Sequence, residues 1–238
     1  DQVAFGAREV DRAGSRDRDD TSVTCWQVMA MKAAEDAGLR VPKRTLERAM
    51  LHFDRARGGT AVDTGVAAYA VEEGRIERGG PAVTAMAMLS LLSLNRKGQE
   101  GFVRKGLEVL REEGGRVRER PNLYGLYFST LSMNLIGGPD WSRWKREVCA
   151  PIAGMQVRAK GARLGSWDPI RDAYGPDGGR VYTTALGVLC LEKARSVPGA
   201  ARGVTTWRRT GMVPNASRLR VGDTEELPLK AVQARVRI

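Results

Sequence analysis

Four stretches of this chain share one layout, in which an apolar run rich in small residues carries a threonine a few residues from its start. When the stretches are aligned on Thr24, Thr84, Thr130 and Thr184, successive threonines lie 60, 46 and 54 residues apart. A period of about fifty residues matches one helical hairpin with its connection, and such periods are typical of stacked repeats. The repeat therefore predicts a fold built from successive helical hairpins.

Two kinds of helix are predicted to alternate along these hairpins. The threonine-containing runs are apolar nearly all round, as expected for inner helices that other helices surround. The segments 43–57, 99–113 and 141–157 are amphipathic and are predicted to pack on one side only, as outer helices. Long Gly-rich connections are predicted over 58–79 and 159–179. The pattern predicts an all-α fold of about seven helices.

The chain is predicted to have three parts: a polar segment over 1–16, a helical repeat domain over 17–196, and a different unit over 197–238. Glycines and prolines interrupt the third part, and its final residues 227–238 alternate apolar and polar side chains, which indicates one β strand. A lone strand leaves its backbone groups unpaired, so we expect it to begin a truncated β domain or to pair with another chain. Because the first residue is Asp1 rather than Met, we expect a fragment or a processed product.

Composition and charge narrow the classes of function. The 238 residues include 39 Lys and Arg against 28 Asp and Glu, a formal charge of +11, but these basic residues are dispersed and not interleaved with aromatic side chains. Nucleic-acid binding is therefore not favoured. No apolar run is long enough for a transmembrane helix. Compartment and oligomeric state are left open by the sequence.

Cysteine and histidine usage argues against metal chemistry. Cys25, Cys149 and Cys190 are odd in number, far apart and set in apolar runs, which predicts buried thiols rather than disulfides or a metal site. The single histidine, His52, lies on a charged outer helix and is predicted to be a surface or boundary residue. We therefore expect no bound metal and no cofactor.

Three segments resemble the prenyltransferase and squalene-oxidase repeat family: the first apolar helix over 20–38, the helix over 124–138 with the DWSRWKREV run that follows it, and GSWDP at 165–169 followed by YTTAL at 182–186. The resemblance covers about residues 17–195. It implies an α/α-hairpin toroid, the shape shared by terpene cyclases, protein prenyltransferase β subunits and thioester domains of complement-like proteins. With fewer hairpins than a full six-hairpin ring, the toroid is expected to be partial.

The residues Asp17, Asp19 and Asp20, followed by Thr21 and Ser22, resemble the DxDDT(A/S) motif of class II terpene cyclases. That resemblance implies Asp19 as the proton donor to an alkene or epoxide, with the other two carboxylates supporting it. The alternative is a helix N-cap. We favour the N-cap, because Arg18 would lower the pKa of a carboxyl group that must stay protonated to act as an acid.

The resemblance also singles out Trp26, Trp167, Asp168, Tyr182 and Thr183 as residues of a ligand site or of a structural motif. Trp167 can cover the end of a helical hairpin with its flat ring, so a structural role is favoured for it and for Asp168.

Our leading hypothesis for function is a non-catalytic toroid module in a larger chain of bacterial type. It would bind a protein segment or an apolar, isoprenoid-like ligand in its concavity. This hypothesis depends on the absence of the Asp-x-Cys zinc motif of protein prenyltransferases and on an aromatic content of only 6%. One alternative is a terpene cyclase-like isomerase with Asp19 as general acid. A third is charge-driven binding of an acidic partner through the Arg-rich residues 197–238.

Overall fold

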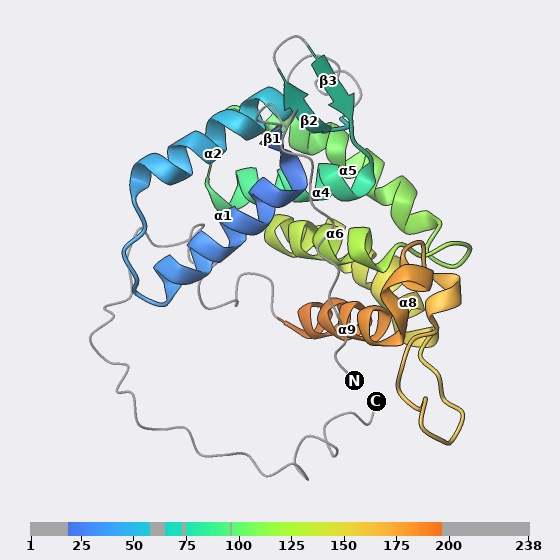
Figure 1. The fold of residues 1–238 in the computed structure, drawn as a ribbon. Coiled ribbons are helices and arrows are strands. Elements are labelled where there is room, and N and C mark those ends of the chain that lie inside the picture. Colours follow the sequence, from blue (N-terminus) through green and yellow to red (C-terminus); the bar gives the residue numbers. More distant parts are fainter. Residues whose placement is uncertain (1–18, 58–64, 73–74, 96, 197–238) are drawn as a thin grey trace, which may run out of the picture.

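The computed structural model describes residues 19–57, 65–72, 75–95 and 97–196 (Figure 1). Within these residues the chain is mostly helical, which confirms the all-α prediction. The predicted polar segment 1–16, the candidate residue Asp17 and the whole of 197–238, with its predicted strand and its proposed acidic partner, lie outside the described residues and stay predictions.

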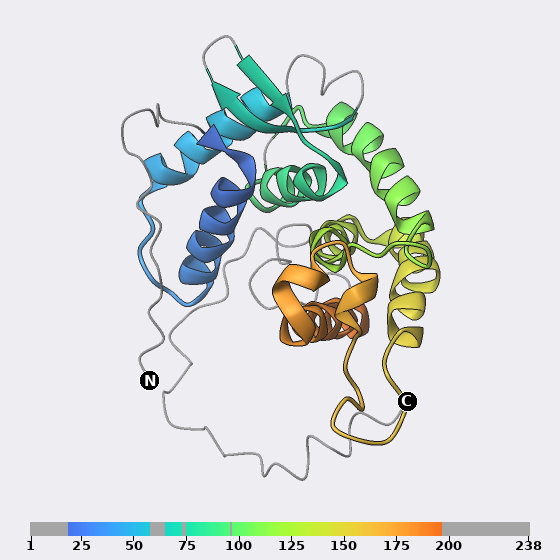
Figure 2. The ribbon, with the colours of Figure 1, turned by 45° about the vertical axis from the view of Figure 1, so that its right-hand side comes forward.

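The helices alternate between an inner and an outer layer along an arc, as Figure 2 shows. The inner layer consists of α1 (Thr21–Asp36), α4 (Pro81–Ser93), α6 (Leu123–Ile136) and α9 (Gly175–Arg195). The outer layer consists of α2 (Lys43–Ala56), α5 (Glu100–Gly115) and a composite helix made of α7 (Gly138–Trp144), the π-helical turn η1 (Lys145–Cys149) and α8 (Ala150–Gly154). The described helices form an arc of hairpins, and closure of that arc into a toroid stays a prediction.

A small antiparallel sheet, which was not predicted from the sequence, lies in the outer layer. Strand β2 (Ala68–Glu72) pairs on one side with β1 (Asp19–Asp20) and on the other with β3 (Arg75–Arg78). The segment 58–79 was predicted only as a Gly-rich connection. Ala68 and Ala70 are the strand residues that face the core, and each is 3% exposed. Because alanine favours strands weakly, this alternation gives little signal in the sequence.

The core is centred on α4, which lies between α1 and α6. Ten of its 13 residues are buried, as expected for a helix covered on all sides. Large side chains of α4 itself and of its neighbour α6 fill the space there, among them Met86 of α4 and Phe128 of α6, which are fully buried. The apolar inner helices predicted from the sequence are therefore the centre of the packed structure.

The repeated threonines link the inner helices to the segments that pack beside them. The hydroxyl of Thr84 accepts a hydrogen bond from the backbone N–H of Ala67 at 3.1 Å, and that of Thr184 accepts one from Trp167 at 3.2 Å, in both cases from a residue 17 positions earlier. Thr130 accepts a hydrogen bond from the indole N–H of Trp144 at 3.0 Å. Two of the four aligned positions thus make equivalent contacts, which explains the recurrence of threonine there.

Candidate ligand site between the inner helices

A cavity of about 420 Å³ lies between the C-terminal halves of the inner helices. Three of these helices supply most of its wall and α9 supplies one residue; the lining residues are Val28, Met29, Lys32, Ala33, Asp36, Leu89, Ser90, Ser93, Leu131, Leu135 and Lys193. The volume falls within the roughly 300–1,000 Å³ of small-molecule sites, and most of the lining is apolar. The exposed side chain of Ala33 shows that the cavity opens to solvent beside α1.

Charged side chains line one part of this cavity. The ammonium of Lys32 lies 2.6 Å from a carboxylate oxygen of Glu35, one turn along α1. Burial raises the pKa of the Asp36 carboxyl group, although the charge of Lys32 acts in the opposite direction. Across the cavity, burial lowers the pKa of Lys193, and Glu192 opposes that change. The apolar surroundings therefore disfavour charge on both Asp36 and Lys193.

Aromatic side chains gather between α1, α6 and the turn that leads into α9, on the N-terminal side of the cavity. We define the aromatic cluster as Trp26, Tyr124, Tyr127, Phe128 and Tyr174. The rings of Trp26, Tyr124 and Tyr127 meet the buried Phe128 edge to face, with centroids 5.1–5.2 Å apart. The Trp26 indole N–H donates to the Tyr124 hydroxyl at 3.2 Å. Phe128 fills the centre of this cluster, while Trp26 and Tyr174 stay 46% and 52% exposed.

Three tyrosines in or near this cluster are held in their neutral form. Burial raises the pKa of Tyr124 and of Tyr127. Burial also raises the pKa of Tyr182 to about 12, with the carboxylate of Asp172 adding to the effect. At neutral pH these side chains can therefore donate hydrogen bonds but carry no charge.

Of the predicted acidic motif, the structure describes the side chain of Asp20 alone. Its carboxylate accepts hydrogen bonds from the backbone N–H groups of Ser22 at 2.7 Å and Val23 at 3.1 Å, and from the Ser22 hydroxyl at 2.6 Å. Burial raises the pKa of this carboxyl group, but the hydrogen bonds from Ser22, Val23 and Tyr69 outweigh burial and leave the pKa lowered. Asp20 is thus the N-cap of α1, while the backbone of Asp19 pairs with Val71 in the sheet.

The GSWDP segment makes structural contacts. Trp167 is 2% exposed and its indole N–H donates to the carbonyl oxygen of Ile152 at 2.8 Å. The Thr183 hydroxyl donates to the carbonyl oxygen of Trp167 at 2.9 Å. Asp168 accepts a hydrogen bond from the backbone N–H of Ile170, at the start of the 3₁₀ turn Pro169–Arg171, and lies 3.6 Å from a guanidinium nitrogen of Arg180. The cavity lining contains none of the five predicted residues, Trp26, Trp167, Asp168, Tyr182 and Thr183.

His52 is buried, so its prediction as a surface or boundary residue was wrong. The side chain is 4% exposed, and Nε2 lies 2.9 Å from the hydroxyl of Thr21, which itself donates to the carbonyl oxygen of Ala68 at 2.8 Å. Because the hydroxyl has one proton and gives it to Ala68, the Nε2–H of His52 is the donor to Thr21. The histidine lies on the face of α2 that packs on α1 and β2. The charged residues of this helix, on which the prediction was based, mark its solvent-facing side and do not show which residues lie on the packed side.

The three cysteines are buried thiols, as predicted. Burial raises the pKa of Cys25 to about 12, a shift that a hydrogen bond from Ser90 partly offsets, and raises that of Cys149 to about 11. The pKa of Cys190 is also raised by burial. At neutral pH all three are protonated and poorly nucleophilic.

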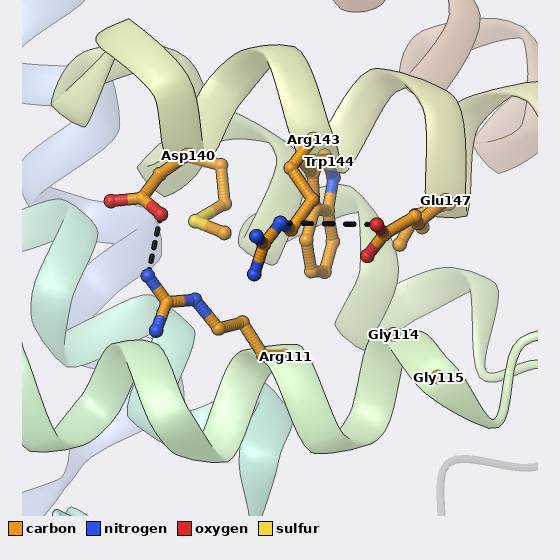
Figure 3. Close-up of a pocket in the computed structure, with 9 residues that line it drawn as sticks. Arg111, Gly114, Gly115, Asp140, Arg143, Trp144 and Glu147 are labelled. Atoms are coloured by element: carbon orange, nitrogen blue, oxygen red, sulfur yellow. Dashed lines mark hydrogen bonds and ion pairs between the residues drawn. The ribbon is translucent and has the colours of Figure 1, made fainter.

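A second hollow lies between the outer helices α5 and α7, where Figure 3 shows Trp144 facing Gly114. Its volume is about 20 Å³, room for about one water molecule. Arg111 pairs with Asp140 at 2.5 Å across it, and Arg143 lies 3.8 Å from Glu147 on the same helix (Figure 3). This hollow is packing space between helices and is too small for an organic ligand.

Comparison of the chain with protein-family models, with curated proteins and with solved structures finds no match. None of the helices in the described part of the chain has the length and apolar character needed to cross a membrane. Over the same residues, His, Cys, Asp and Glu side chains form no group of three that could hold a metal ion. Among the described residues, the cavity between the inner helices is the feature that indicates a function.

The cavity residues themselves were not predicted from the sequence. Met29, Leu131 and Leu135 look like ordinary core positions in a helical pattern, and only their place near the open side of the arc makes them cavity walls. The available signal was Lys32 near the end of the first apolar run, together with Lys193 near the end of the last. Charged residues at such positions indicate a polar opening in an apolar surface.

Proposed function

We propose that this chain is a helical-hairpin binding module, similar to the prenyltransferase and squalene-oxidase repeat family, that holds an apolar ligand in the cavity between α1, α4 and α6. The observation that carries the proposal is the cavity itself, with its volume of about 420 Å³ and walls in which Val, Met, Ala and Leu side chains outnumber the polar ones. Burying an alkyl chain there is worth about 0.8 kcal/mol per CH₂ group. A site of this size fits a small apolar molecule better than a folded protein segment.

The proposal can be tested with 1-decanol as the probe and two tryptophan variants of α1. Ala33 lines the cavity and is exposed, so Ala33→Trp fills the opening without disturbing a buried position. Ala30 is exposed on the same helix but does not line the cavity, so Ala30→Trp is the matched control.

Titration calorimetry should show saturable binding of 1-decanol to the unmodified chain and to Ala30→Trp. Binding to Ala33→Trp should be weaker by at least about tenfold, because the indole ring occupies the space of the alkyl chain. Absence of saturable binding to the unmodified chain, or equal affinity in both variants, would contradict the proposal.

A second candidate is a terpene cyclase-like isomerase with Asp19 as its general acid. The observation in its favour is the aromatic cluster close to the start of α1, since aromatic faces stabilise cations. Incubation of the chain with a prenyl epoxide should yield cyclic products under this hypothesis, and Asp19→Asn should abolish them. The binding-module proposal expects no cyclic product from either protein.

A further inference from the structure

We propose that the ligand of the cavity is an alkyl or isoprenoid carboxylate, whose apolar chain lies between α1, α4 and α6 and whose acid group pairs with the ammonium of Lys193. The inference rests on the proposed function and adds the chemical class of the ligand. It is carried by the place of Lys193, a lysine in a mainly apolar cavity wall whose other ammonium, that of Lys32, is already paired with Glu35.

The two ammonium groups at the cavity are in different situations. Lys32 is paired with Glu35 at 2.6 Å, and Asp36 follows on the same helix, so the positive charge on α1 already has carboxylate partners. Lys193 lies on α9, and no described residue lies within ion-pair distance of its ammonium; Glu192, its neighbour in sequence, is exposed. The side chain that remains for an incoming anion is therefore Lys193.

The surroundings of Lys193 favour an anion that brings an apolar body. The side chain is only partly exposed and lines a cavity whose other walls are mainly apolar. A half-buried ammonium loses part of its hydration, and a carboxylate that binds beside it restores a charge-assisted hydrogen bond. An alkyl chain attached to that carboxylate fills the adjacent space, whereas a small inorganic anion would leave it empty.

A competing role for Lys193 is purely structural. It lies in the last turn of α9, where a basic side chain complements the partial negative charge of the helix C-terminus. Arg195 lies in the same turn, is exposed and does not line the cavity. Substitution of Arg195 therefore removes a positive charge from the same helix end without touching the cavity, and it separates the two roles.

The test compares decanoate with 1-decanol, which have the same chain length and different head groups, in titrations at pH 7.5. The unmodified chain and Arg195→Gln should bind decanoate about tenfold more tightly than 1-decanol, as expected for one charge-assisted hydrogen bond. Lys193→Gln should lose this preference while keeping its affinity for 1-decanol. Thermal unfolding of all three proteins checks that each is folded.

The possible results of these titrations distinguish the carboxylate inference from the proposed apolar binding site on which it rests. If 1-decanol binds but decanoate has no advantage, or if Lys193→Gln retains that advantage, the carboxylate inference is wrong and the apolar site stands. If Arg195→Gln loses the preference as fully as Lys193→Gln does, the effect belongs to the helix end and the inference is again wrong. If neither compound binds saturably, the proposed function itself fails.

Discussion

The two ends of the inner helices differ in how their space is filled. Towards their N-termini, the rings of the aromatic cluster close around Phe128, and Asp20 caps α1. Towards their C-termini, the same helices leave a cavity of about 420 Å³. Protein interiors are normally packed with few voids larger than a water molecule. A cavity of this size at one end of a well-packed layer therefore indicates room for a ligand rather than poor packing in general.

The largest expected effect compares two substitutions on α6. Phe128 is fully buried in the aromatic cluster, whereas Leu131 is half-buried in the cavity wall. Phe128→Ala should lower the free energy of unfolding by about 3–5 kcal/mol, because it removes a large side chain from a packed site. Leu131→Ala should cost less than about 2 kcal/mol, because that side chain already borders empty space. Urea denaturation measures the free energy of unfolding of both variants. Equal losses of stability would contradict the difference in packing between the N-terminal and C-terminal ends of the inner helices.

A smaller effect is expected at the cap of α1. Asp20→Ala should lower the free energy of unfolding by about 1 kcal/mol, because the backbone N–H groups of Ser22 and Val23 lose their acceptor. Asp20→Asn is the matched control and should cost less, since the asparagine side chain can also cap a helix. Thermal denaturation in the same buffer compares the variants. If Asp20→Ala were as stable as the unmodified chain, Asp20 would not be the working cap.

The same carboxylate should contribute to acid sensitivity. The pKa of Asp20 is lower in the folded chain than its ordinary value of about 3.9. Its contribution to stability is therefore present above pH 3.9 and is lost as the pH falls through the lower folded value. Asp20→Asn removes this titration, so the difference in stability between the two proteins should shrink below pH 4. A difference that stays constant from pH 6 to pH 3 would contradict the lowered pKa.

The smallest effect is expected for the cysteines, which should hardly react in the folded chain. Burial raises the pKa of Cys25 to about 12 and that of Cys149 to about 11, so the thiolate is scarce at pH 8. Iodoacetamide at pH 8 should modify the folded chain slowly and the urea-unfolded chain rapidly, as measured by mass spectrometry. Rapid modification of Cys25 in the folded chain would show that the packing between α1 and α4 opens readily.

The helices could be predicted from the sequence because their pattern repeats and is local. The aligned threonines and the amphipathic segments give the order of inner and outer helices, and Thr84 and Thr184 make equivalent contacts. The buried state of His52 and the sheet around Ala68 could not be predicted, since both depend on contacts between segments far apart in the chain. The cavity depends on four helices at once, and no single segment encodes it.

The most direct measurement is a crystal structure of the chain grown with decanoate. We predict electron density for the alkyl chain between α1, α4 and α6, with the carboxylate within hydrogen-bond distance of the Lys193 ammonium. Decanoate bound at the aromatic cluster instead, or a cavity without ligand density in crystals that contain saturating decanoate, would contradict it.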